Sequence, residues 1–238
     1  MMGAVEMSGP EGSGPVRIVF FQHGILLNRW FFRPLEAFLA RRGFRTVNRS
    51  YPTTRRTIEE HAAALRLLVE ERTRDLRQRG VPHEVDFVTQ SMGGLVVRQL
   101  LTHHDVANVR RCVFIVPPNN GSAKARQYSS IPLYGLIYGS RAGAQLAEEP
   151  PGIFADCGIP KGVEMGIIAG VRGSWFSLPS RSLQRPHDGV VSLEETRLSG
   201  VPLKELPFGH TTVLFRRRAM EEVASFLEEG RFKPAISS

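Results

Sequence analysis

The sequence predicts an α/β fold, with a mostly parallel central sheet and helices on both of its faces. Short apolar runs rich in β-branched and aromatic residues alternate with longer amphipathic stretches, which is the order that builds parallel sheets. In addition, a polar residue lies one to three positions past the end of each of three apolar runs, namely His23, Ser91 and Asn119. The carboxyl ends of parallel strands share one edge of a sheet, so we expect these residues to meet at a common site.

The chain length fits one domain. Its 238 residues, 42% of them apolar and 23% charged, are enough to bury a core without disulfides or metals. We expect a flexible segment over residues 1–15, a single domain over 16–231 and a tail over 232–238. Residues 1–15 lack the basic start and apolar core of a signal peptide, and no run approaches the ~18 apolar residues of a membrane span. We therefore expect a cytoplasmic protein.

The formal net charge of +8 raises the possibility of a nucleic-acid partner. The basic residues are nearly all arginines spread along the chain, and doublets such as Arg110-Arg111 fit solvated loop edges and helix ends. No basic stripe interleaved with aromatic residues occurs. We interpret the charge as a weak attraction to anionic surfaces, including membranes, and expect no nucleic-acid partner.

The two cysteines provide neither a disulfide framework nor a zinc motif. Cys112 lies within an apolar run, and Cys157 lies in a loop-like region. We therefore expect no metal and no cofactor. The sequence leaves the oligomeric state open.

Six strands and four main helices account for most of the chain. An apolar run broken only by Arg17 predicts the first strand, and Gly43 ends the helix that follows the first turn. Thr57 and Glu60 form a capping-box pattern at the start of a long helix. The predicted strands cover residues 16–21, 44–48, 85–89, 112–116, 162–169 and 201–206, and the predicted helices cover 30–42, about 57–79, the segment after Ser91, and 218–229.

The stretch that carries the chemistry lies between the third predicted strand and the helix after it, where the chain reads Gln90-Ser91-Met92-Gly93-Gly94. A serine on a sharp strand-to-helix turn exposes its hydroxyl at the carboxyl end of the sheet, and the following N–H points at an oxyanion formed there. The two glycines permit a close approach of the helix and strand backbones. Thr89 stands where the first glycine of a G-x-S-x-G motif is expected, so an ordinary N-capping serine remains an alternative.

A serine becomes a nucleophile when a base takes its proton and an acid orients that base. In the chain order serine, acid, histidine, His210 is the best base, because it lies in a loop between the last predicted strand and the last helix. His103 and His104 are too close to Ser91 in sequence, and His187 directly precedes the best acid.

Asp188 is the best acid, because it lies in a turn between the last two predicted strands. Asp105 ends the helix after Ser91 on the wrong side, and Asp156 belongs to an insertion. Glu194 and Glu195 remain as runners-up. Elimination therefore leaves Ser91, Asp188 and His210 as the catalytic candidates.

Residues 123–160 interrupt the alternation of strands and helices with apolar and aromatic residues between glycines and prolines. We expect a small cap over the site that forms an apolar substrate pocket, although a simple cover for the sheet edge is an equal alternative. The predicted substrate contacts are Leu26, Tyr134, Ile137 and Tyr138.

Together these motifs resemble α/β-hydrolases of the serine lipase and esterase kind, and they are similar to those of small bacterial lipases and of lipase-like relatives of GPI inositol-deacylases. The matching stretches, which extend over residues 16–231, are His23-Gly24-Ile25, Ser91-Met92-Gly93-Gly94, Asn119 to Ser122, Asp188-Gly189-Val190-Val191 and Gly209-His210-Thr211. The resemblance implies the α/β-hydrolase fold, with Ser91 as nucleophile, His210 as base and Asp188 as its orienting acid.

The resemblance also implies an oxyanion hole made by the backbone N–H groups of Ile25 and Met92, and a structural role for His23 in the loop of that hole. Gln90 replaces a frequent histidine, which leaves the local hydrogen bonding open. The expected function is hydrolysis of apolar carboxylic esters, lipids included, through an acyl-enzyme on Ser91. Acyl transfer or thioester hydrolysis by the same triad, and a catalytically silent binding scaffold, are the alternatives.

Overall fold

The centre of the fold is a six-stranded parallel sheet with the strand order β2-β1-β3-β4-β5-β6. The computed structural model describes residues 14–173 and 182–234, so most of the expected N-terminal segment and C-terminal tail lie outside the described residues. The strands are β1 (Val16–Gln22), β2 (Arg45–Asn48), β3 (His83–Gln90), β4 (Val109–Ile115), β5 (Glu164–Gly170) and β6 (Leu203–Leu206).

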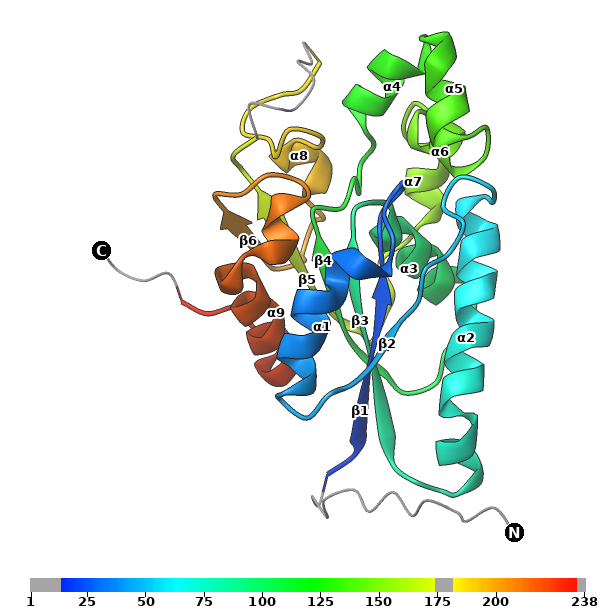
Figure 1. Ribbon diagram of the computed structural model, residues 1–238, viewed down its shortest axis with the longest axis vertical. Coiled ribbons are helices and arrows are strands. Elements are labelled where there is room, and N and C mark those ends of the chain that lie inside the picture. Colours follow the sequence, from blue (N-terminus) through cyan, green and yellow to red (C-terminus); the bar gives the residue numbers. More distant parts are fainter. Residues whose placement is uncertain (1–13, 174–181, 235–238) are drawn as a thin grey trace.

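Helices cover both faces of the sheet (Figure 1). On one face lie α2 (Ile58–Gln78) and α3 (Met92–His103), and on the other lie α1 (Arg33–Ala40) and α9 (Arg217–Glu229). Shorter elements of the described chain are η1 (Arg29–Phe32), α4 (Ala123–Ser129), α5 (Pro132–Tyr138), α6 (Ala142–Leu146), α7 (Gly152–Asp156), α8 (Leu193–Thr196) and η2 (Thr212–Phe215).

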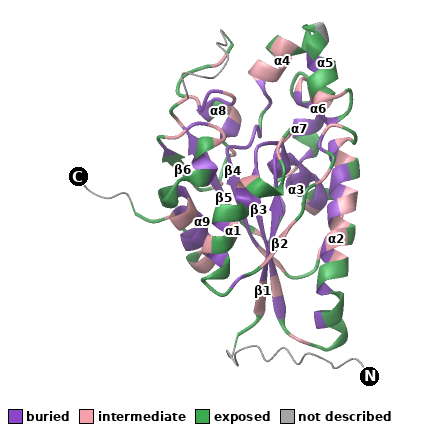
Figure 2. Ribbon diagram, in the orientation of Figure 1, coloured by how far each residue is buried: buried purple, intermediate pink, exposed green. Residues whose placement is uncertain are grey.

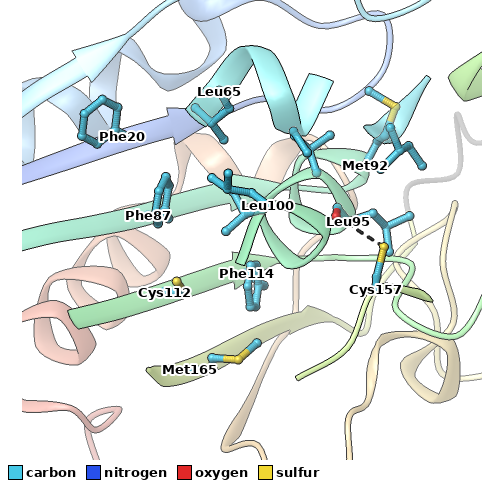
Figure 3. Close-up of a cluster of buried hydrophobic side chains, with 14 of the residues drawn as sticks. Phe20, Leu65, Phe87, Met92, Leu95, Leu100, Cys112, Phe114, Cys157 and Met165 are labelled. Atoms are coloured by element: carbon cyan, nitrogen blue, oxygen red, sulfur yellow. Dashed lines mark hydrogen bonds between the residues drawn. The ribbon is translucent and has the colours of Figure 1, made fainter. Parts of the chain in front are cut away.

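Side chains of the strands alternate between the two faces and so divide the core into two clusters. On β1, Phe20 packs with residues of α2 and α3, whereas Phe21 packs with residues of α1 and α9. Figure 3 shows the first cluster, in which Phe20, Phe87 and Phe114 come from β1, β3 and β4. Because both faces are buried, as Figure 2 shows, the central strands have continuous apolar sequences instead of alternating ones.

The strand order reverses at β1, and this reversal positions the site. From β1 the chain passes to β2 at one edge, while β3 and the later strands extend the sheet in the other direction. The loops after β1 and β3 therefore diverge and open a crevice at the carboxyl ends of two neighbouring strands. His23 follows β1 and Ser91 follows β3, and Gln22 is paired with Thr89 where the two strands end.

Two local expectations were wrong. The helix expected over 30–42 is divided: Asn28 caps a 3-10 turn, and the α-helix begins at Arg33 because Pro34 suits a first helical turn, where its missing N–H costs nothing. Arg111, expected at a solvated edge, is buried. Its guanidinium donates to the Leu227 carbonyl near the end of α9 at 2.7 Å and pairs with Glu164 at 2.7 Å. The helix C-terminus favours a cation, which explains why this arginine lies inside.

Between β4 and β5, α4 to α7 lie beyond the carboxyl end of the sheet (Figure 1). Arg98 on α3 holds both ends of this insertion. Its guanidinium donates to the Asn119 carbonyl at 3.2 Å and to the carbonyls of Cys157 and Gly158. Burial lowers the pKa of Arg98, and among the described residues its charge is met by carbonyl oxygens and the amide of Asn119 instead of a carboxylate.

Both cysteines are free and buried, and the Cys157 thiol lies 3.5 Å from the Leu95 carbonyl (Figure 3). Of the expected tail, Phe232 packs on α9 with its ring centroid 4.9 Å from that of Phe226. Among the helices in the described ranges, none combines the length and the apolar character needed to cross a bilayer.

Candidate active site

Ser91 lies on the tight turn between β3 and α3. Its backbone has φ 53° and ψ −127°, a conformation that residues other than glycine rarely adopt and that costs ~1–3 kcal/mol. The Ser91 N–H donates to Ile115 O at 2.9 Å, and the Gly94 N–H donates to Ser91 O at 2.9 Å. Within the described chain the Ser91 hydroxyl makes no capping hydrogen bond to α3. The ordinary N-cap alternative therefore does not describe this serine.

Glycines at and beside this turn allow it to form, because a Cβ at their positions would meet neighbouring atoms. A Cβ on Gly93 would lie 2.1 Å from the Gln22 carbonyl oxygen, and a Cβ on Gly24 would lie 2.9 Å from Ser91 Cβ. Thr89, which replaces the first glycine of the common motif, is fully buried. A Cβ on Gly94 would lie 3.4 Å from Thr89 Oγ1, which is an ordinary contact distance, and 3.1 Å from Pro117 Cβ. The turn therefore forms with a threonine at this position.

Asp188 and His210 form a hydrogen-bonded pair. Asp188 Oδ2 lies 2.6 Å from His210 Nδ1, and the His210 N–H donates to the Asp188 carbonyl at 3.0 Å. The other carboxylate oxygen accepts the N–H groups of Val190 and Val191, each at 2.8 Å. Asp188 is almost fully buried, so these contacts hold its carboxylate, and through it the imidazole, in one orientation.

Ser91 and His210 line the same cavity of about 470 Å³. We call the side formed by Ile25, Leu26, Gln90, Ser91 and His210 the floor of the cavity. The opposite side comes from α4, α5 and the short link between them, and we call it the roof. It is lined by Lys124, Ala125, Tyr128, Ile131, Leu133, Tyr134, Ile137 and Tyr138. The lining is mainly apolar, and an apolar cavity with a few convergent polar groups is typical of ligand sites.

The two expected oxyanion donors flank Ser91. Ile25 lines the floor, and Met92 follows Ser91 directly as the first residue of α3, with its side chain in the buried core. Neither backbone N–H donates a hydrogen bond to any described residue. The next backbone N–H, that of Leu26, donates a hydrogen bond to Thr53 Oγ1 at 3.1 Å.

Gln90 links the loops on either side of Ser91. Its side-chain Oε1 accepts the Gly24 N–H at 3.1 Å, and its side-chain Nε2 donates to the His210 carbonyl at 3.3 Å. One buried side chain therefore ties the loop after β1 to the loop that carries His210. The sequence indicated this position as unusual without indicating its role.

A layer of aromatic rings lies beneath the loop after β1. His23 stacks on Tyr51 with ring centroids 4.3 Å apart, and Tyr51 meets His61 edge-on at 4.7 Å. The Tyr51 hydroxyl donates to the His23 carbonyl, and His23 Nδ1 contacts the Gly24 carbonyl at 3.1 Å. Burial lowers the pKa of both histidines, that of His61 to about 4, so both are neutral at pH 7.

The predicted substrate contacts Leu26, Tyr134, Ile137 and Tyr138 all line the cavity. Tyr134 and Tyr138 stack with ring centroids 4.6 Å apart, and the Tyr134 hydroxyl donates to the Gly143 carbonyl at 2.9 Å. Leu26 has a positive φ of 60° and is half-exposed beside Ser91.

The runner-up acids lie elsewhere in the hydrogen-bond network. Glu195 forms a capping box with Ser192 and accepts the Ala123 N–H at 2.5 Å, which ties α8 to the start of α4. Glu194 is exposed in the first turn of α8. Sequence reasoning missed Lys124, which lines the cavity, and Arg98, which holds the insertion. Within the described ranges, no group of three or more histidine, cysteine or acidic residues is placed to bind a metal ion.

No protein-family model matches the chain, and no curated protein matches it either. Several solved structures, in contrast, are similar to it in fold. The mature lipase BlEst2 of Bacillus licheniformis superimposes with a TM-score of 0.67 at 15% identity, over 93% of this chain and 95% of that one. The esterase PF2001 of Pyrococcus furiosus gives 0.65 at 18% identity, over 90% and 82%. Phospholipase PlaB of Legionella pneumophila gives 0.63 at 18% identity over 76% of this chain, which spans only 45% of PlaB. The parallel sheet, its helical layers and these likenesses confirm the expected fold: the chain has the α/β-hydrolase fold.

Proposed function

We propose that this protein is a serine carboxylic-ester hydrolase that cleaves apolar acyl esters through an acyl-enzyme on Ser91. The observation that carries the proposal is the Asp188–His210 pair, joined at 2.6 Å, whose imidazole lines one apolar cavity together with Ser91. The solved structures with the same fold include proteins named as a lipase and an esterase, which supports the same reaction class.

In this mechanism Ser91 Oγ attacks the ester carbonyl while His210 Nε2 takes its proton. The bond between Asp188 and Nδ1 fixes the tautomer that leaves Nε2 free to accept, and it stabilises the imidazolium that results. The imidazolium then protonates the leaving alcohol, and the acyl group remains on Ser91. A water molecule, deprotonated by His210, then attacks the acyl carbonyl. As the bond between the acyl carbon and Ser91 Oγ breaks, the His210 imidazolium returns the proton to Oγ, which releases the carboxylic acid and restores the enzyme.

The N–H groups of Ile25 and Met92 are the proposed donors to the tetrahedral oxyanion. They are not engaged by other described residues, and Ile25 lines the floor beside Ser91. Such a donor contributes ~3–4 kcal/mol to transition-state stabilisation. Because Gln90 holds the adjacent Gly24 N–H, the Ile25 amide is positioned before substrate arrives.

The proposal is tested with a series of p-nitrophenyl esters of increasing acyl length. We expect the wild type to hydrolyse them, Ser91→Ala to fall to the uncatalysed rate, and Asp188→Asn to lose about 10⁴-fold in kcat because the imidazole takes the wrong tautomer. Ser199→Ala, which alters an exposed serine before β6, is the matched control and should retain full activity.

Product analysis separates hydrolysis from acyl transfer. Hydrolysis releases one carboxylic acid for each alcohol in plain buffer. Turnover that requires an added alcohol or thiol, with no free acid formed, would instead identify an acyltransferase. If folded wild type acted on none of the esters, the proposed function would be wrong, and the binding-scaffold alternative would become the better one.

A further inference from the structure

Lys124 places a cationic group in the wall of the cavity. It lies in α4, and its Nζ donates to the Gly189 carbonyl at 2.6 Å. Apart from His210, no other described residue that lines the cavity can carry a charge at neutral pH. Among the described lining residues, the roof therefore contains one lysine surrounded by aromatic and aliphatic side chains.

This ammonium forms no direct ion pair with a described residue, although the Asp188 carboxylate attracts it through space. The closest candidate is Asp188, next to Gly189, but both of its carboxylate oxygens are already engaged, by Val190 and Val191 on one side and by His210 on the other. A lysine ammonium has three donors, and Gly189 takes one of them. Partial burial of Lys124 lowers its pKa, which reflects the cost of holding the charge away from water.

Lys124 is not needed to fasten α4 in place. The segment that leads into α4 already binds α8: the Ala123 N–H donates to Glu195, and the Asn119 amide donates to the Thr196 carbonyl at 2.8 Å. Asn120 adds hydrogen bonds to the carbonyls of Glu194 and Arg197. A cation kept in an apolar wall beyond these contacts favours a role in binding.

We propose that Lys124 is a specificity residue that binds an anionic group, a carboxylate or a phosphate, on an otherwise apolar ester substrate. The proposal rests on ester hydrolysis at Ser91. The anion supplies a direct ion pair and the further acceptors that the ammonium lacks, while the apolar lining holds the hydrocarbon part of the substrate. Lys124 contacts the substrate away from the ester carbonyl and takes no part in the bond-breaking steps.

The test compares charged and neutral esters in matched pairs. For the acyl arm, the pair is the mono-p-nitrophenyl ester of octanedioic acid and p-nitrophenyl octanoate. For the alcohol arm, it is an aryl octanoate with a phosphate on the aryl ring and the same ester without the phosphate. The variants are Lys124→Met, Lys124→Arg and, as a matched control, Lys161→Met, which removes a lysine from an exposed turn before β5.

The readout is the ratio of kcat/KM for the charged ester to that for its neutral partner. In Lys124→Met we expect this ratio to fall about tenfold in one arm, as for the loss of a partly desolvated charge-assisted contact. Lys124→Arg should keep most of the ratio and Lys161→Met all of it. The arm that responds shows whether the anion belongs to the acyl or the alcohol part.

Two results would overturn the proposal while ester hydrolysis stands. One is an equal fall for charged and neutral esters in Lys124→Met, which would make Lys124 a link between α4 and the Asp188 turn; thermal melting of the variant shows whether folding is affected. The other is an unchanged ratio in both arms. Absence of wild-type activity on all four esters is a different result, because it would remove the proposed function itself.

Discussion

The floor and the roof of the cavity are held by different kinds of contact. In the floor, Ser91 is 8% exposed, and Gln90 beside it is buried and hydrogen-bonded to the loops on both sides. In the roof, the apolar side chains of Leu133 and Leu136 on α5 are 54% and 81% exposed. The floor is thus fixed by buried hydrogen bonds, whereas the roof is an apolar layer with much of its surface uncovered (Figure 2).

This difference separates two requirements of the proposed chemistry. Proton transfer and oxyanion binding need donors and acceptors at fixed distances, which buried polar networks provide. Binding an acyl chain needs apolar area and tolerates variation in shape. We therefore expect substitutions to have large effects where the floor is anchored and small effects on the outer side of the roof.

The largest effect is expected where roof and floor are joined, at Arg98. Arg98→Met keeps the volume of the side chain but leaves the carbonyls of Asn119, Cys157 and Gly158 without their donor. Buried polar groups that lose their partners each cost ~1–3 kcal/mol, so we expect the free energy of unfolding to fall by about 3–5 kcal/mol. Urea denaturation of the two proteins measures this change.

Arg141→Met is the matched control. Arg141 in the same insertion pairs with Glu60 at 2.8 Å, but both side chains are about half exposed. An exposed ion pair contributes about 0–1 kcal/mol, so this variant should unfold close to the wild type. Similar losses for both arginines would contradict the view that Arg98 anchors the insertion.

Within the floor, Gln90→Ala should reduce ester hydrolysis without unfolding the protein. It removes the link between the Gly24 N–H and the His210 carbonyl, and small displacements of catalytic groups cost up to about 10²-fold in rate. We expect kcat to fall by about 10- to 100-fold with KM little changed. Gln78→Ala, at the exposed end of α2, is the control and should keep the wild-type kcat.

An unchanged kcat in Gln90→Ala would show that the loops on the two sides of Ser91 hold their positions without this bridge. Activity retained in Gln90→His, which introduces the residue that the family resemblance leads us to expect at this position, would show that either side chain can make the link. Loss of activity in both variants would mean that the reaction needs both contacts of the Gln90 side chain, the one to the Gly24 N–H and the one to the His210 carbonyl.

Much of the fold was predictable because the sheet is buried on both faces. Short apolar runs such as the one at Cys112 to Val116 predict strands that are buried on both faces. The glycines after Ser91 predict a tight turn between a strand and a helix. The turn at Ser91, the Asp188–His210 pairing and the cavity residues followed from chain order and from the loops that end neighbouring strands.

What the sequence could not predict depends on long-range contacts. The burial of Arg98 and Arg111 is decided by the carbonyls they meet, which lie 21 to 116 residues away along the chain. The boundary of α1 depended on Pro34, and the bridging role of Gln90 on two loops at sequence separations of 66 and 120. Arginine and glutamine are usually exposed, so composition alone favours the wrong environment.

Beneath the floor, His61 should make stability depend on pH. Burial lowers its pKa from 6.5 to about 4, so the unfolded chain takes up a proton first as the pH falls. Stability is then fully present above pH 6.5 and declines as the pH falls toward 4, by about 2–3 kcal/mol in total. We expect the unfolding free energy of His61→Gln to lack this decline. The stability of the wild type relative to the variant should therefore fall as the pH is lowered from 6.5 to 4.

The comparison with the variant also removes the contribution of Asp86. Burial raises the pKa of that carboxyl group to about 6, so its protonation stabilises the folded state as the pH falls and acts against His61. Because Asp86 is present in both proteins, its contribution cancels in the difference. Parallel stability curves for wild type and His61→Gln between pH 6.5 and 4 would rule out His61 as a source of acid sensitivity.

The smallest effect is expected on the outer side of the roof. Leu136→Ala removes a side chain that is already 81% exposed, so the free energy of unfolding should change by less than about 0.5 kcal/mol. Leu100→Ala is the matched control, because Leu100 on α3 is fully buried and its truncation should cost about 2–5 kcal/mol. If Leu136→Ala were instead as costly as Leu100→Ala, α5 would have to be covered in solution, and the contrast between an anchored floor and an uncovered roof would not hold.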